Sequence, residues 1–181
     1  MVTSEALAME KAKELLRQYV LAGFTKIHID TSMHLGDDNH ECCLDTATIA
    51  KRGAILCNVA QEAYKELKQI NPAVLEPVYV VGSEVPIPGG SQEEEGIQIT
   101  RVVDFKDTVE TFKKAFLEYK LEDAWENIIA VVVQPGVEFG DETILYMNTS
   151  EKQQRIYVRL LENIQILFLK GIPQIIKQKN A

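Results

Sequence analysis

Apolar residues recur at regular intervals along most of the chain, and the interval changes from one segment to the next. Spacing of three and four, with Leu15 and Tyr19 among the apolar positions, predicts a helix over residues 4–22. Ser4 is its expected N-cap and Gly23 its C-terminal stop. The following segment, residues 24–30, alternates between apolar and polar positions. This alternation predicts a strand with one buried face and one polar face.

Helical and strand patterns continue to alternate after this strand. Helical spacing returns over residues 45–69, with Asp45 as the expected N-cap and Asn71-Pro72 as the end. Polar segments over 31–44, 86–96 and 136–143 are expected to be loops. The other predicted elements are a strand over 77–85, a helix near 105–120 capped by Asp104, a strand over 128–135, a helix over about 150–170 and a short strand over 172–178.

This order predicts parallel β–α–β units in an α/β fold. Strands as apolar as residues 128–135 indicate a sheet that helices cover. Such units form either a small open sheet or part of a TIM barrel, a (β/α)₈ barrel. In both arrangements the functional groups lie at the C-terminal ends of the strands.

Composition and charge exclude several classes of function. The formal net charge of −8 argues against a nucleic-acid surface and against docking on an anionic membrane. No apolar run approaches the roughly 20 residues of a membrane span, and the acidic N-terminal segment does not resemble a signal peptide. The three cysteines, two of them adjacent, do not form a disulfide framework. We therefore expect a cytoplasmic protein.

Polar residues at the ends of three predicted strands form the candidate site. Asp30 could orient a sugar hydroxyl or act as an acid or base, or it could simply cap the loop that follows. Glu84 could bind a hydroxyl or a metal, or accept backbone N–H groups. Asp30 and Glu84 are therefore the catalytic candidates. The candidate substrate-binding residues are His28, Asp30, Ser32, Glu84, Gly89, Gly90 and Gln134.

Metal and phosphate chemistry have weaker support in the sequence. His28 could ligate a metal, but a single inward histidine is usually hydrogen-bonded within the core. Gly89-Gly90 could bind phosphate through backbone amides, although an acidic run follows them. The loop over 31–44 carries metal-ligand residue types, but its adjacent cysteines suit a tetrahedral zinc site poorly, and Asp37-Asp38 suggest a solvated loop. We expect no bound metal.

Three long segments resemble one known family, the non-catalytic subunits of class II tagatose-bisphosphate aldolase. They are residues 8–33, residues 79–90 (YVVGSEVPIPGG) and residues 128–139 (IIAVVVQPGVEF), which occur in the family's order. The resemblance covers about residues 8–146. It implies a TIM-barrel fold, of which 181 residues would form one partial domain over 1–181.

The resemblance also implies a function. Proteins of this family support a separate, zinc-dependent catalytic subunit that splits tagatose 1,6-bisphosphate during galactitol and N-acetylgalactosamine breakdown. The zinc would then belong to that partner, and this chain would need no cofactor. Within the family pattern, Asp30, Glu84 and Gln134 fall at the mouth of the barrel. The family has also carried the label of tagatose-6-phosphate kinase, but the sequence has no GxxxxGK[ST] loop.

Two functional hypotheses follow, from different classes. The first is a non-catalytic accessory subunit whose partners are a catalytic aldolase subunit and a second copy of itself. The second is a metal-dependent aldolase-like enzyme that uses His28, Asp30 and Glu84. A catalytic zinc site needs several histidine ligands, and the sequence has only three histidines, two of them in one loop. A remnant without function is a third possibility.

Overall fold

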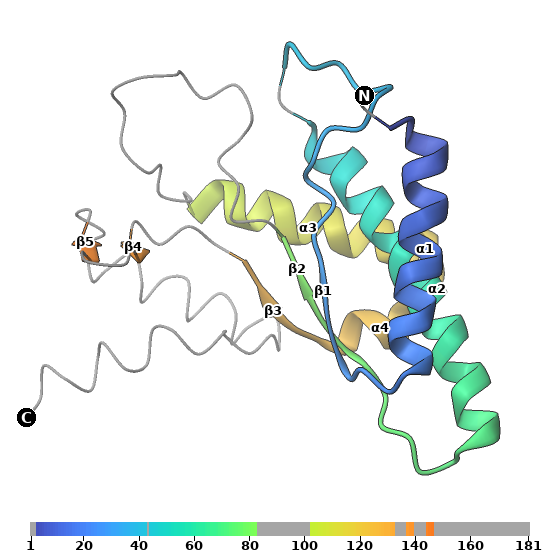
Figure 1. The fold of residues 1–181 in the computed structure, drawn as a ribbon. Helices are drawn as coiled ribbons and strands as arrows, with labels where there is room; N and C mark the ends of the chain where they lie inside the picture. Colours follow the sequence, from blue (N-terminus) through green and yellow to red (C-terminus); the bar gives the residue numbers. More distant parts are fainter. Residues whose placement is uncertain (1–2, 43, 83–101, 133–136, 140–143, 147–181) are drawn as a thin grey trace, which may run out of the picture.

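The computed structural model describes residues 3–42, 44–82, 102–132, 137–139 and 144–146. Helices and strands alternate through most of this part of the chain (Figure 1). The elements are α1 (Glu5–Leu21), β1 (Lys26–Ile29), α2 (Thr46–Ile70), β2 (Val78–Val81), α3 (Val102–Glu118), α4 (Glu122–Glu126), β3 (Ile128–Val131), β4 (Val137–Phe139) and β5 (Ile144–Tyr146).

The first three strands form a parallel sheet in the order β1-β2-β3. Ile27 pairs with Tyr79 between β1 and β2, and Tyr79 pairs with Ile128 between β2 and β3. The register between β2 and β3 shifts after Tyr79. Alternate residues of β1 and β2, together with Ile128 and Val131 of β3, join one hydrophobic core with residues of α1, α2, α3 and α4, so the helices pack on one face of the sheet (Figure 1).

Strand order and helix placement together decide between the two folds that the sequence allowed. An open, doubly wound sheet reverses its strand order and carries helices on both faces. Here the strands follow the chain order, and the helices of the described part pack on a single face. This is the arrangement of a sector of a TIM barrel, and it confirms the predicted parallel β–α units in a partial barrel.

Close packing of α2 against β1 and α3 depends on Gly53. A Cβ atom added to Gly53 would lie 3.2 Å from Cε1 of Phe112 and 3.6 Å from Cγ2 of Ile29. Both neighbouring side chains are almost fully buried. Helix, sheet and second helix therefore meet at a point where only a hydrogen atom fits without rearrangement.

Several predicted helix boundaries are confirmed, and the cap predicted at Ser4 is wrong. Asp45 caps α2 by accepting a hydrogen bond of 2.9 Å from the Thr48 N–H, and Gly23 ends α1 with a φ of +89°. Ser4 precedes α1, but its side chain makes no capping hydrogen bond. Instead, Oδ2 of Asp37, from a distant loop, accepts from the Glu5 N–H at 2.7 Å. The cap is tertiary, and local sequence rules do not anticipate it.

Other differences lie around α3 and after β3. Asp104 was expected to cap α3 but lies within its first turn, because the helix already begins at Val102. The short helix α4 was not predicted. Part of the loop expected over 136–143 forms β4, which pairs antiparallel with β5. The predicted helix over 150–170 and strand over 172–178 lie outside the described residues.

None of the helices in the described ranges combines the length and apolar character that crossing a bilayer requires.

Candidate functional site at the strand ends

The candidate site lies on the sheet face that points away from the helices. Ile27 and Ile29 of β1 are buried in the helical core, so by alternation Lys26, His28 and Asp30 point to the opposite face. In a barrel this opposite face is the interior. His28 and Asp30 are both exposed and lie near or just beyond the C-terminal end of β1. The structure thus places them where barrel enzymes hold substrates.

The ring of His28 has a fixed orientation. Its Nε2 lies 3.1 Å from the carbonyl oxygen of Gly82, which follows β2. A carbonyl oxygen only accepts, so Nε2 carries the proton in this contact. In the neutral ring, Nδ1 is then left as a hydrogen-bond acceptor. His28 is hydrogen-bonded, as predicted for an inward-facing histidine, but it is exposed rather than buried.

Gly82 provides that carbonyl in a conformation that other residues rarely adopt. Its φ is +99°, and an added Cβ atom would lie 3.2 Å from the backbone nitrogen of Val132 and 3.3 Å from its carbonyl oxygen. Both atoms belong to the backbone, so making room for a side chain would require the backbone itself to shift. A glycine here allows the ends of β2 and β3 to approach while its carbonyl group faces His28.

The carboxylate of Asp30 is partly occupied by its own loop. Oδ1 accepts hydrogen bonds from the Ser32 N–H at 3.0 Å and from the Ser32 hydroxyl at 2.7 Å. This is the capping role that the sequence offered as the alternative to substrate binding. Ser32 itself is buried. Its hydroxyl proton is directed to Asp30, so Ser32 acts on the site mainly by orienting that carboxylate.

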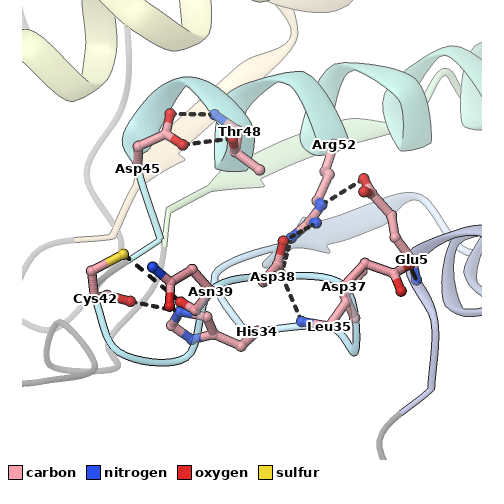
Figure 2. A network of polar contacts seen from close by, with 10 residues as sticks. All are labelled: Glu5, His34, Leu35, Asp37, Asp38, Asn39, Cys42, Asp45, Thr48 and Arg52. Atoms are coloured by element: carbon pink, nitrogen blue, oxygen red, sulfur yellow. Dashed lines mark hydrogen bonds and ion pairs between the residues drawn. The ribbon is translucent and has the colours of Figure 1, made fainter.

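A buried arginine holds the loop that follows β1 (Figure 2). Arg52 of α2 is only 3% exposed, and its two terminal nitrogens donate to the carboxylate of Asp38 at 2.7 and 2.9 Å. Its Nε donates to Glu5 of α1 at 3.0 Å. Asp38 also accepts from the Leu35 N–H at 2.7 Å. One guanidinium group therefore joins two helices and the loop, in the two-pronged geometry that makes such pairs strong.

These contacts correct the expectation of a solvated loop for Asp38, whereas Asp37 is exposed as expected. The side chain of Asp38 is 10% exposed and paired with Arg52, while Asp37 caps α1. The hydrogen bond from Arg52 lowers the pKa of Asp38 to about 2, and Asp38 in turn raises the pKa of Arg52. The two groups stay charged over the whole physiological range. The loop is therefore held in one shape by a largely buried ion pair.

Acid is expected to destabilise the fold through Asp38. Its folded-state pKa lies below the ordinary value of 3.8, so its contribution to stability is complete above that value and is lost as the pH falls toward about 2. Thermal melting followed by circular dichroism between about pH 5 and pH 2 measures this. In Asp38→Asn the melting temperature should fall less steeply as the pH decreases. Asp123→Asn, on the surface of α4, should leave this pH dependence unchanged. Equal slopes in all three proteins would contradict the assignment.

The histidine- and cysteine-rich part of the same loop has other contacts. The ring centroids of His34 and His40 lie 5.1 Å apart, and Nε2 of His34 lies 2.9 Å from the carbonyl oxygen of Cys42. Within the part of the chain that the structure describes, no three His, Cys, Asp or Glu side chains converge on a point where they could hold a metal ion. Cys43 lies outside that part.

The structure places only part of the predicted site. Glu84, Gly89, Gly90 and Gln134 lie outside the described residues. Conversely, Arg52 was not among the residues predicted from the sequence. One signal was available, because Arg52 interrupts the apolar stripe of α2 beside Ile49 and Gly53. A charged residue in such a stripe requires a partner of opposite charge.

Comparisons with known proteins agree on one family. The chain matches the family described as "D-tagatose-1,6-bisphosphate aldolase subunit GatZ/KbaZ-like" over residues 2–170. It is 44% identical over 149 residues to the D-tagatose-1,6-bisphosphate aldolase subunit GatZ of Salmonella agona (strain SL483), a match that covers 82% of this chain and 34% of the relative. The subunit of the same name from Escherichia coli O1:K1 / APEC is 42% identical, with 81% and 33% covered.

A solved structure shows a similar fold. It is the crystal structure of a probable tagatose 6 phosphate kinase from Sinorhizobium meliloti 1021, with a TM-score of 0.68 and 31% sequence identity. The similarity covers 91% of this chain and 36% of that one. The chain thus spans about a third of the length of the relatives that it matches.

Proposed function

The chain belongs to the D-tagatose-1,6-bisphosphate aldolase subunit GatZ/KbaZ-like family, and on this ground we propose that it is a non-catalytic accessory subunit. It supports the activity and stability of a separate catalytic class II aldolase subunit in the cytoplasm. The pathway is carbohydrate breakdown through tagatose 1,6-bisphosphate, as in galactitol and N-acetylgalactosamine catabolism. The observation that carries the proposal is the match over residues 2–170, with 44% identity to a named aldolase subunit.

The strand-end site supplies acceptors for a polyhydroxylated ligand. Nδ1 of the neutral His28 ring is available as an acceptor, and Oδ2 of Asp30 lies beside the oxygen that Ser32 occupies. His28 and Asp30 are two residues apart on one face, or about 6.6 Å along a strand. Sugar hydroxyl groups could donate to both. Glu84, Gly89, Gly90 and Gln134 complete the proposed substrate-binding set on the basis of the family resemblance.

The zinc ion of the reaction belongs, in this proposal, to the catalytic subunit. The sequence contains only three histidines, and His34 and His40 share one loop while His28 lies on β1. Histidine ligands gathered from several strands, which a catalytic zinc site of this kind needs, are therefore not present in the sequence. This favours the accessory role over the alternative of a metal-dependent enzyme.

The name of the solved relative suggests a kinase, an activity that this sequence does not support. A kinase of the P-loop type needs a GxxxxGK[ST] segment whose backbone amides hold the phosphates, and no such segment occurs in the 181 residues. The family match and the relatives named as aldolase subunits outweigh the name of that one structure.

Association with the catalytic subunit tests the proposal. A class II tagatose-bisphosphate aldolase catalytic subunit, mixed with this chain at micromolar concentration and passed over a gel-filtration column, should elute with it in one peak. Bovine serum albumin in place of the catalytic subunit controls for non-specific adsorption. Separate elution of the chain and the catalytic subunit at every concentration tried would contradict the accessory role.

A further inference from the structure

Within the strand-end site formed by His28 and Asp30, the carboxylate of Asp30 takes its orientation from Ser32. Its Oδ1 accepts the Ser32 N–H at 3.0 Å and the Ser32 hydroxyl at 2.7 Å. Both bonds go to the same oxygen, so the position of Ser32 decides where the other oxygen, Oδ2, lies. Ser32 is only 7% exposed, although it belongs to the loop that follows β1. Whatever holds Ser32 in place therefore also orients this carboxylate.

Thr31 attaches the loop to α2 on one side of Ser32. Its hydroxyl group donates to the carbonyl oxygen of Ile49 at 2.7 Å. A Cβ atom added to Gly53 would lie 3.7 Å from the same hydroxyl oxygen. Ile49 and Gly53 are four residues apart, which is about one turn of a helix. The two contacts therefore place the side chain of Thr31 against a single turn of α2, residues 49–53.

Arg52 attaches the loop to the same turn of α2 on the other side of Ser32. Its guanidinium group donates to the two carboxylate oxygens of Asp38 at 2.7 and 2.9 Å. Oδ2 of Asp38 also accepts from the Leu35 N–H at 2.7 Å, and the Asp38 N–H donates to the Leu35 carbonyl oxygen at 3.0 Å. Asp38 thus closes a turn with Leu35, and Arg52 holds that turn as a unit.

The two attachment points, Thr31 and Leu35, are separated by only three residues, 32–34. A connection this short has few backbone conformations once both of its ends are held. Loss of either attachment frees one end and gives the connection more conformations to occupy. The amide and hydroxyl groups of Ser32, its first residue, would then no longer stay directed at Asp30.

We propose that Thr31 and Arg52 are positioning residues for the strand-end site. From one turn of α2 they hold the loop so that Ser32 meets Asp30. The alternative is a purely local turn, because an aspartate can accept the N–H two residues further on without help from the rest of the protein. The burial of Ser32 between two points attached to α2 favours support from the helix. The inference rests on the proposed function in treating Asp30 as a ligand-binding group.

Amide hydrogen exchange in the full chain, followed by NMR, tests the positioning. Thr31→Val removes the hydroxyl group with little change in side-chain volume. The Ser32 amide should then exchange at least about tenfold faster, because opening of the loop becomes easier. The Tyr79 and Val132 amides, which donate to Asn127 and Val81 within the sheet, should keep their rates. Equal acceleration at all three amides would contradict the proposal, since it would show a general loss of stability.

Three further variants complete this measurement. Thr31→Ser keeps the hydroxyl group and should restore the slow exchange of Ser32. Thr25→Val makes the matched change on an exposed residue just before the opposite end of β1, and it should have no effect. Arg52→Lys keeps the charge but loses the two-pronged contact with Asp38, so it should also speed exchange at Ser32. Unchanged exchange at Ser32 in both Thr31→Val and Arg52→Lys would overturn the proposal in favour of the local turn.

Calorimetric titration with tagatose 1,6-bisphosphate separates this inference from the proposed function. The dissociation constant should rise about tenfold in Thr31→Val and return to the parent value in Thr31→Ser. A parent chain that binds no tagatose 1,6-bisphosphate would contradict the proposed substrate-binding set, and the exchange rates alone would then decide whether Thr31 and Arg52 hold Ser32. Equal binding by the parent chain and Thr31→Val would overturn the positioning role and leave the proposed function intact.

Discussion

Replacing Arg52 with methionine is expected to lower the free energy of unfolding by about 3–5 kcal/mol, a large part of the stability of a typical domain. Methionine fills much of the space but leaves the carboxylate of Asp38 without its partner at a site where that side chain is only 10% exposed. Glu5 loses its contact with α2 at the same time. Breaking one half of a buried ion pair is costly, because the remaining charge cannot recover its hydration.

Urea denaturation measures this change, and two variants sharpen it. Arg17→Met removes an ion pair with Glu66 in which both side chains are well exposed, so it should cost at most about 1 kcal/mol. Asp38→Asn in the Arg52→Met background removes the unpaired charge and should recover part of the loss. Equal effects of Arg52→Met and Arg17→Met would show that the Arg52 network does not stabilise the fold.

Much of the fold followed from local patterns. Alternation in residues 24–30 and helical spacing in 45–69 predicted β1 and α2 because each element buries a continuous face of its own. The caps at Asp45 and Gly23 are also local interactions. The choice between an open sheet and a barrel sector depended on which face the helices cover. That is a property of several elements together, and the structure was needed to show it.

Predictions from local sequence patterns were wrong where a contact with a distant part of the chain overrides the local signal. Ser4 has the right residue type for a cap but makes no capping hydrogen bond, and the N–H that is bound at this helix end, that of Glu5, donates to Asp37 from a distant loop. Leu15 and Tyr19 fit the helical period, but both are exposed. Spacing alone does not show which apolar positions a neighbouring element covers.

The candidate site was predictable in its position but not in its contacts. Strand alternation placed His28 and Asp30 correctly on one face near the C-terminal end of β1. It could not show that Gly82 fixes the ring of His28 or that Ser32 occupies one oxygen of Asp30. Nor could it find the pairing of Arg52 with Asp38, because those residues lie on different elements and meet only in the fold.

Support of a catalytic partner should have a large effect on enzyme activity. An accessory subunit stabilises its partner by binding the partner's native state. At an accessory-subunit concentration of 100 times the dissociation constant, this binding stabilises the partner by about 2.7 kcal/mol. The catalytic subunit should therefore keep most of its activity through a heat treatment that inactivates it alone. His28→Gln and Asp30→Asn should weaken this protection of the catalytic subunit where it depends on substrate that the two subunits share. His34→Gln, a histidine outside the strand-end site, is the matched control and should not.

The most direct test of the accessory role is a coupled assay for glycerone phosphate released from tagatose 1,6-bisphosphate. Three samples are heated and then assayed: this chain alone, a class II catalytic subunit alone, and the two together. The accessory role predicts no release above background from this chain, and more activity from the mixture than from the catalytic subunit alone. Turnover by this chain alone that disappears in Asp30→Ala, or a mixture no more active than the catalytic subunit, would contradict it.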